Sequence, residues 1–268
     1  MLTILAGLAL IAYVALAAIF FFTQRSLLYY PSHAYMTPTQ AHANPSYREI
    51  EVRTEDGVAL RGWYAPAKEG HCTIVFFHGN ADQLATASEV GDAYIAQGYG
   101  FLVAEYRGYS GLPGKPTEKG LYADGRAYMH YLMSHGVDAQ QIVLYGHSLG
   151  TGVATEMATE FHVGGVMLLA PYLSIPQVGQ THFAIFPVNL LALDRFDNER
   201  KIGRISSPLL IANGTDDQVI PPRQGRKLFE LAHEPKEFHP IPGRGHNDAF
   251  DAFEPISVEW MLKACHCE

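Results

Sequence analysis

The sequence predicts an α/β protein, in which a mainly parallel sheet carries helices on both faces and an apolar helix precedes it. Three observations lead to this prediction. Short apolar runs alternate with helical patterns along most of the 268 residues, as in successive β-α-β units. The runs are continuously apolar, as in strands that are buried on both faces. The first charged side chain is Arg25, so the stretch before it forms a region of its own.

The composition excludes several classes of protein. Charged residues make up 17% of the chain, hydrophobic residues 48%, and the formal net charge is −8. This negative charge argues against nucleic acid as a partner, because phosphate binding needs a basic surface. The three cysteines cannot form a disulfide framework without leaving one over. The length is sufficient for one large domain with its own core.

The N-terminal apolar run, Leu2 to Phe22, contains no charged residue. As a helix it would span about 30 Å, the hydrocarbon thickness of a bilayer. A cleaved secretory signal usually begins with basic residues and ends in small ones, and a buried core helix is usually shorter and amphipathic. We therefore expect residues 1–24 to be a single-pass transmembrane anchor, with the lipid membrane as its partner. Arg25 only weakly favours a cytoplasmic catalytic side, so the orientation stays open.

The next elements are a linker and a hairpin. Residues 25–45 contain several Pro, Ser, Thr and Asn residues and are expected to connect the anchor to a folded domain over 46–268. At its start, Arg48–Pro66 contains Asp56-Gly57, a pair that is typical of a tight hairpin turn. We expect two antiparallel strands there.

The alternation of strands and helices begins after this hairpin. Five mainly apolar runs predict strands of the parallel sheet: Cys72–Phe77, Gly100–Glu105, Gln141–Tyr145, Val163–Ala170 and Pro208–Ala212. A further strand is predicted over Glu237–Ile241. Helical patterns fill the intervals: Gln83–Gln97, Thr117–His135, a stretch that ends near Phe161, a stretch after Pro222, and Asp248–Lys263. The segment 171–200 interrupts the alternation. It is largely apolar and aromatic, and we expect it to be a small cap inserted after a strand.

The motif Gly146-His147-Ser148-Leu149-Gly150 lies between a predicted strand and a predicted helix. This is the sequence and context of a nucleophile elbow, a turn so sharp that side chains two residues before and after the serine would clash. The serine hydroxyl is thereby exposed at the carboxyl end of the sheet. An ordinary strand-to-helix turn is the alternative, and the context favours the elbow.

A serine nucleophile needs a base and a group that orients the base. In this arrangement the acid and then the histidine follow the serine along the chain. His246 follows the last predicted strand, and we expect it to be the base. Asp217 follows the preceding strand and is the expected acid, with Asp216 as the alternative. Both loops leave the same edge of a parallel sheet, where active sites of such folds lie.

Acyl transfer also needs hydrogen-bond donors for the developing oxyanion. The residue after the nucleophile, Leu149, would supply one backbone N–H. The second donor is expected from the loop after the first parallel strand, His78-Gly79-Asn80-Ala81, and we assign the backbone N–H of Asn80.

Five motifs in this order resemble the α/β-hydrolase family. The motifs are Phe77–Ala81, Tyr106–Gly111, Gly146–Gly150, Gly214–Asp217 and Gly245–Asp248. The most similar branch is the membrane-anchored group known as serine-aminopeptidase-like or α/β-hydrolase-domain proteins, in which a hydrophobic helix precedes a segment like Gln24–Pro31. The resemblance implies the α/β-hydrolase fold for nearly the whole chain. In the family's Gly-Thr-x-Asp element the fourth residue is the acid, which favours Asp217. Glu105 departs from the aspartate common in the family, and we expect its role to be structural.

These residues predict a serine hydrolase that cleaves an ester, thioester or amide through an acyl-enzyme, without a metal or cofactor. Together, the apolar segment 171–200 and the anchor favour a small-molecule substrate of acyl or lipid-like character, and we expect esterase or thioesterase activity before peptidase activity. Two alternatives stay open: a catalytically inactive membrane-binding module and a true serine peptidase. Cys265-His266-Cys267 resembles half of a zinc site, but it lacks a partner pair and is expected to be a frayed tail.

Overall fold

An eight-stranded sheet, in the order β1-β2-β4-β3-β5-β6-β7-β8, forms the centre of the computed structural model, which describes residues 1–264. The hairpin predicted around Asp56-Gly57 is present, and its second strand, β2, is antiparallel to both β1 and β4. All other neighbours are parallel. The strands are β1 (Arg48–Arg53), β2 (Ala59–Ala65), β3 (Thr73–Phe77), β4 (Gly100–Ala104), β5 (Ile142–His147), β6 (Gly165–Leu169), β7 (Leu209–Gly214) and β8 (Lys236–Ile241).

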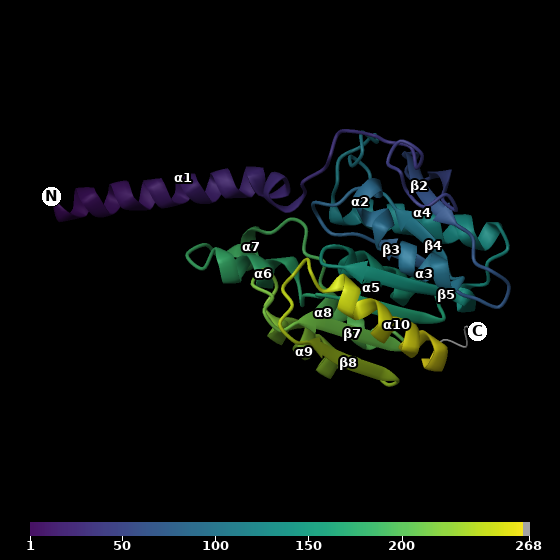
Figure 1. Cartoon of the computed structure of the whole chain (residues 1–268). Coiled ribbons are helices and arrows are strands. Elements are labelled where there is room, and N and C mark those ends of the chain that lie inside the picture. The colour runs from purple at the N-terminus through teal and green to yellow at the C-terminus, as the bar shows by residue number, and fades with distance from the viewer. Residues whose placement is uncertain (265–268) are drawn as a thin grey trace.

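Helices cover both faces of this sheet (Figure 1). One face packs against α4 (Glu118–Ser134), α5 (Gly150–Glu160) and α9 (Pro222–Leu231). The other packs against α2 (Leu84–Glu89), α3 (Asp92–Gln97) and α10 (Phe250–Ala264). Alternate residues of the buried strands enter the two cores, as Val75 and Phe76 do in β3. The predicted fold class is confirmed.

The predicted helix Gln83–Gln97 is wrong in one respect, because α2 and α3 are separate helices that meet near Gly91. A side chain at Gly91 would clash with the Tyr47 hydroxyl and with the Phe101 ring. The chain therefore approaches its neighbours closely at this point. That contact is between residues distant in the sequence, so the helical pattern of the segment does not reveal it.

The N-terminal helix α1 (Leu2–Leu28) extends away from the sheet (Figure 1). An 18-residue window within it has a mean hydropathy of 2.6, and the helix is long and apolar enough to cross a membrane. It continues past residue 24, where the anchor was expected to end, since a charged residue such as Arg25 does not stop a helix. Tyr29 is already extended and precedes Tyr30 and Pro31, the first proline of the chain.

The segment expected to be a cap lies between β6 and β7 and contains three short helices. These are α6 (Ile175–His182), α7 (Val188–Leu191) and α8 (Asn198–Lys201). In Figure 1, α6 and α7 lie beside the domain end of α1, and contacts between side chains described below join them. The tail Cys265-His266-Cys267 lies outside the residues that the structure describes.

Candidate active site

Ser148 lies in a sharp turn between β5 and α5, and its φ of 50° is in the left-handed region. A residue with a side chain rarely adopts this conformation, and such strain is typical of functional sites. The two glycines of the motif allow the turn. A Cβ on Gly146 would lie 2.6 Å from Cα of Thr151, and one on Gly150 would clash with the carbonyl oxygen of Phe77.

The structure brings His246 and Asp217 to this serine. Nε2 of His246 lies 2.9 Å from Oγ of Ser148, and Nδ1 of His246 lies 2.8 Å from Oδ2 of Asp217. The other carboxylate oxygen of Asp217 accepts hydrogen bonds from the backbone N–H groups of Val219 and Ile220, each at 2.8 Å. A buried carboxylate with both oxygens engaged is held in one orientation, and it in turn orients the imidazole.

Asp216, the alternative acid, does not reach the histidine. Its side chain is exposed, and its Oδ1 accepts a hydrogen bond from the Thr215 hydroxyl. Its backbone N–H donates to the carbonyl oxygen of Arg244. The residue thus joins the loops after β7 and β8. At the same contact, a side chain on Gly214 would clash with Arg244, so the glycine lets the two loops approach each other.

The two expected oxyanion donors lie in segments that touch each other, because the Gly150 turn packs against the Phe77 and His78 carbonyls. Within residues 1–264, neither the Asn80 nor the Leu149 backbone N–H donates to a protein acceptor. The carbonyl oxygen of Asn80 accepts bonds from the Tyr30 N–H and the Tyr109 hydroxyl. These contacts hold the Asn80 loop in place and leave its N–H available.

Glu105 contacts residues on both sides of the Asn80 loop, and the sequence did not identify these partners. This fully buried carboxylate contacts Nε2 of His78 at 2.7 Å and accepts bonds from the Leu84 N–H and the Ser110 hydroxyl. Nδ1 of His78 faces the carbonyl oxygen of Gly79 at 2.8 Å. Both ring nitrogens therefore face acceptors, as in a protonated imidazole. Burial opposes this charge, but the Glu105 carboxylate, together with the Asp82 charge and the Gly79 carbonyl, raises the pKa of His78 above its ordinary value.

His147, the residue before Ser148, is a second buried histidine, and the sequence did not reveal its contacts. Its Nε2 lies 3.2 Å from the carbonyl oxygen of His246, so a neutral ring can donate to the backbone of the expected base. Burial and the neighbouring charge of His246 lower the pKa of His147 to about 4. Its place inside the elbow motif was the only sequence signal for this role.

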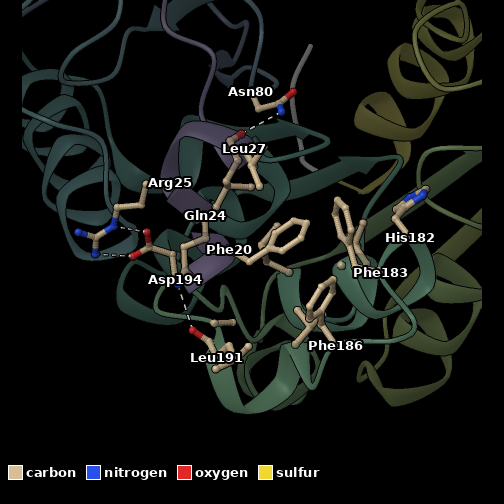
Figure 2. A pocket seen from close by; sticks show the side chains of 16 residues that line it. Phe20, Gln24, Arg25, Leu27, Asn80, His182, Phe183, Phe186, Leu191 and Asp194 are labelled. Atoms are coloured by element: carbon tan, nitrogen blue, oxygen red, sulfur yellow. Dashed lines mark hydrogen bonds and ion pairs between the residues drawn. The ribbon is translucent and has the colours of Figure 1, made fainter. Parts of the chain in front are cut away.

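A cavity of about 260 Å³ has Asn80 in its lining (Figure 2). It is lined by the end of α1, by residues of α6, α7 and the segments that follow them, and by Asn80. Ser148 does not line it. Two contacts connect the cavity to the expected catalytic residues. Asn80, the expected second oxyanion donor, lines the cavity. His182 of the cavity wall contacts the carbonyl oxygen of Val219, whose N–H donates to Asp217. Among the described residues, no cluster of three or more His, Cys, Asp or Glu side chains could hold a metal ion.

Comparison with known proteins gives consistent matches. The model of the family described as serine aminopeptidase, S33, matches residues 68–198. An uncharacterised protein of Mycobacterium tuberculosis is 35% identical over 245 residues, which cover 90% of this chain and 87% of that protein. Protein bem46 of Schizosaccharomyces pombe is 30% identical over 263 residues, which cover 90% of this chain and 86% of that protein. The human α/β hydrolase domain-containing protein 17B is 36% identical over 66% of this chain and 60% of its own length.

Solved structures share the fold at lower identity. An esterase of Pyrococcus furiosus superposes with a TM-score of 0.68 at 18% identity, over 88% of this chain and 96% of its own. An acetyl xylan esterase from Paenibacillus gives the same TM-score and identity, over 90% of this chain and 99% of its own. A puromycin-hydrolyzing peptidase of Mycobacterium tuberculosis gives 0.68 at 15% identity, over 83% of this chain and 40% of its own.

Proposed function

This chain belongs to the α/β-hydrolase family, in the branch described as serine aminopeptidase S33, and we propose that it is a serine hydrolase acting through an acyl-enzyme. The observation that carries the proposal is the continuous hydrogen-bonded chain from Ser148 through His246 to Asp217, with distances of 2.9 and 2.8 Å. Nucleophile, base and orienting acid within hydrogen-bond reach are the geometric signature of such catalysis.

In the proposed reaction, Oγ of Ser148 attacks the substrate carbonyl while Nε2 of His246 accepts the serine proton. Asp217 keeps the proton of Nδ1 in place and stabilises the imidazolium that forms. The backbone N–H groups of Leu149 and Asn80 bind the oxyanion. The imidazolium then gives its proton to the leaving group. A water molecule, activated by the same base, attacks the acyl-enzyme and restores the free serine.

For the substrate, we propose an acyl ester or thioester. The apolar lining of the cavity beside Asn80 supports this choice, and no Asp, Glu, Lys or Arg occurs between Phe161 and Leu193. An aminopeptidase must bind a substrate ammonium group. Asp194 is the only acidic residue among those that line the cavity, and it is already paired with Arg25. The names of the solved neighbours include both esterases and a peptidase, so the choice rests on the cavity.

We also propose that α1 anchors the enzyme in a membrane as a single span. The helix is 27 residues long and has no buried residue. It would therefore exceed the roughly 30 Å hydrocarbon thickness of a bilayer.

A substrate panel tests the proposed activity on the full-length protein in detergent micelles. The panel contains p-nitrophenyl esters of increasing chain length, acyl thioesters and aminoacyl p-nitroanilides. We expect turnover of esters and thioesters, and background rates for Ser148→Ala. Ser134→Ala, at an exposed serine on α4, is the matched control and should keep the wild-type rate. Preferred cleavage of anilides would identify a peptidase instead, and no turnover by the folded protein would favour a binding module.

A further inference from the structure

The end of α1 is bonded to the cap segment rather than connected to it only through the chain (Figure 2). Nε and Nη2 of Arg25 lie 2.8 and 3.2 Å from the two carboxylate oxygens of Asp194, whose side chain is only 5% exposed. The amide of Gln24 donates to the Leu191 carbonyl at 3.1 Å and accepts from the Leu193 N–H at 2.8 Å. Charge-assisted bidentate pairs of this kind fix relative orientation.

Aromatic contacts continue this interface along the helix. The Phe20 ring packs against the rings of Phe183 and Phe186, with centroids 5.1 and 4.6 Å apart. Tyr13 stacks on Phe186 and donates a hydrogen bond from its hydroxyl to the Ile185 carbonyl. From Tyr13 to Arg25 the cap therefore follows α1 for about 18 Å, at 1.5 Å per residue.

The cavity lies between these two surfaces, so α1 is one of its walls. Phe20 and Leu28 of α1 line it together with Val178 and Ala192 of the cap. The lining also includes Asn80, whose side-chain amide donates to the Leu28 carbonyl at 2.9 Å. The last residue of the helix is thus hydrogen-bonded to the residue that carries the proposed oxyanion donor.

The rim of the cap is apolar and exposed. Phe183, Ile185, Leu190 and Leu193 are 40%, 73%, 84% and 48% exposed. Exposed apolar side chains grouped in this way mark an interaction surface. They are continuous with the exposed apolar surface of α1, and Tyr13, which contacts the rim, is in the middle of that helix. A lipid leaflet is the occupant that suits both surfaces.

We propose that the last turns of α1 form a wall of the acyl-binding site, and that the acyl chain enters the cavity from the leaflet around α1 and the cap rim. The inference rests on the proposed hydrolase function and deepens it. The substrate is a long-chain acyl ester or thioester that resides in the membrane. The helix that anchors the enzyme thereby also determines which acyl chains reach Ser148.

The wall formed by α1 is tested with Phe20→Ala and its matched control Phe22→Ala, in full-length protein in phosphatidylcholine nanodiscs. Phe22 is on the same helix, is 82% exposed and does not line the cavity. The readout is kcat/KM for p-nitrophenyl dodecanoate divided by kcat/KM for p-nitrophenyl acetate. We expect this ratio to fall about tenfold in Phe20→Ala, because the chain loses apolar contacts, and to stay at the wild-type value in Phe22→Ala.

A second pair tests the cavity from the cap side. Ala192→Trp places a large ring in the cavity, whereas Ala96→Trp places the same ring on the exposed face of α3, outside the cavity lining and away from the cap. The dodecanoate-to-acetate ratio should fall by at least about tenfold in the first variant only.

The two proposals fail in different ways. If wild type hydrolyses acetate esters but the ratio is the same in each variant as in its control, the cavity is not the acyl site and the inference is overturned alone. If wild type hydrolyses neither ester and a fluorophosphonate does not label Ser148, the hydrolase function and the inference both fail.

Discussion

Replacing Asp217 by asparagine should nearly abolish activity while leaving the fold intact. Oδ1 of Asp217 accepts two backbone N–H bonds of 2.8 Å, from Val219 and Ile220. In Asp217→Asn the amide oxygen must keep this position, because an NH₂ group there would face two donors. The NH₂ group then takes the place of Oδ2 and donates to Nδ1 of His246. The imidazole is forced to carry its proton on Nε2, where it can no longer accept the serine proton.

The size of this effect follows from the tautomer. The same change in a serine protease triad lowers kcat about 10⁴-fold, which corresponds to about 5 kcal/mol of transition-state stabilisation. Both backbone hydrogen bonds are retained, so the free energy of unfolding should change by less than about 1 kcal/mol.

The assay is the initial rate of p-nitrophenyl acetate hydrolysis by full-length wild type, Asp217→Asn and Asp216→Asn, with thermal unfolding of each as a check on the fold. Asp216 is exposed and bonds only to Thr215 through its side chain, so its variant should keep a rate within about twofold of wild type. A rate for Asp217→Asn within tenfold of wild type would refute the reasoning. A larger loss in Asp216→Asn than in Asp217→Asn would assign the acid to the other residue.

Three further predictions concern stability, measured as the free energy of unfolding in urea. Gly150→Ala should destabilise the protein by about 3 kcal/mol, because its Cβ would clash with the Phe77 carbonyl; unchanged stability would mean that the turn is less tight. Glu105→Gln should destabilise most below about pH 6.5, where wild-type His78 is charged in both folded and unfolded states. The difference should shrink as pH rises through the raised pKa of His78 in the folded state, and a difference independent of pH would argue against the charged pair. His147 has its pKa lowered to about 4, so between about pH 6.5 and pH 4 the unfolded state binds a proton that the folded state does not. The free energy of unfolding of wild type should therefore decrease as the pH falls through that range, and that of His147→Gln should decrease less. Parallel pH profiles of the two proteins would contradict this.

Most of the fold could be predicted from the sequence, because most strands are local, continuous apolar runs. The strands β3 to β8 lie within a few residues of the predicted ranges. For β3 to β7 the reason is that apolar runs of this length, bounded by polar loops, favour strands buried on both faces. The edge strand β8 is only partly buried. The hairpin could be placed from Asp56-Gly57 alone. The family assignment is confirmed by the relatives that match almost the whole chain. The roles of Ser148, Asp217 and His246 stay predictions, which the observed distances support.

What the sequence could not provide depends on contacts between distant residues. The end of α1 was expected to lead into a connecting segment, but Gln24 and Arg25 bond to residues 167 to 169 positions away in the chain. No periodicity or local motif encodes such a contact. The buried pair His78 and Glu105, 27 residues apart, was missed for the same reason.

The proposal that Ser148 is an activated nucleophile is tested most directly by labelling with a fluorophosphonate. Wild type, Ser148→Ala and Ser134→Ala are treated with the probe in detergent micelles, and the modified peptide is identified by mass spectrometry. We predict one stoichiometric adduct on Ser148 in wild type and in Ser134→Ala, and none in Ser148→Ala. Equal labelling of Ser148→Ala, or no labelling of the folded wild-type protein, would contradict the proposed function.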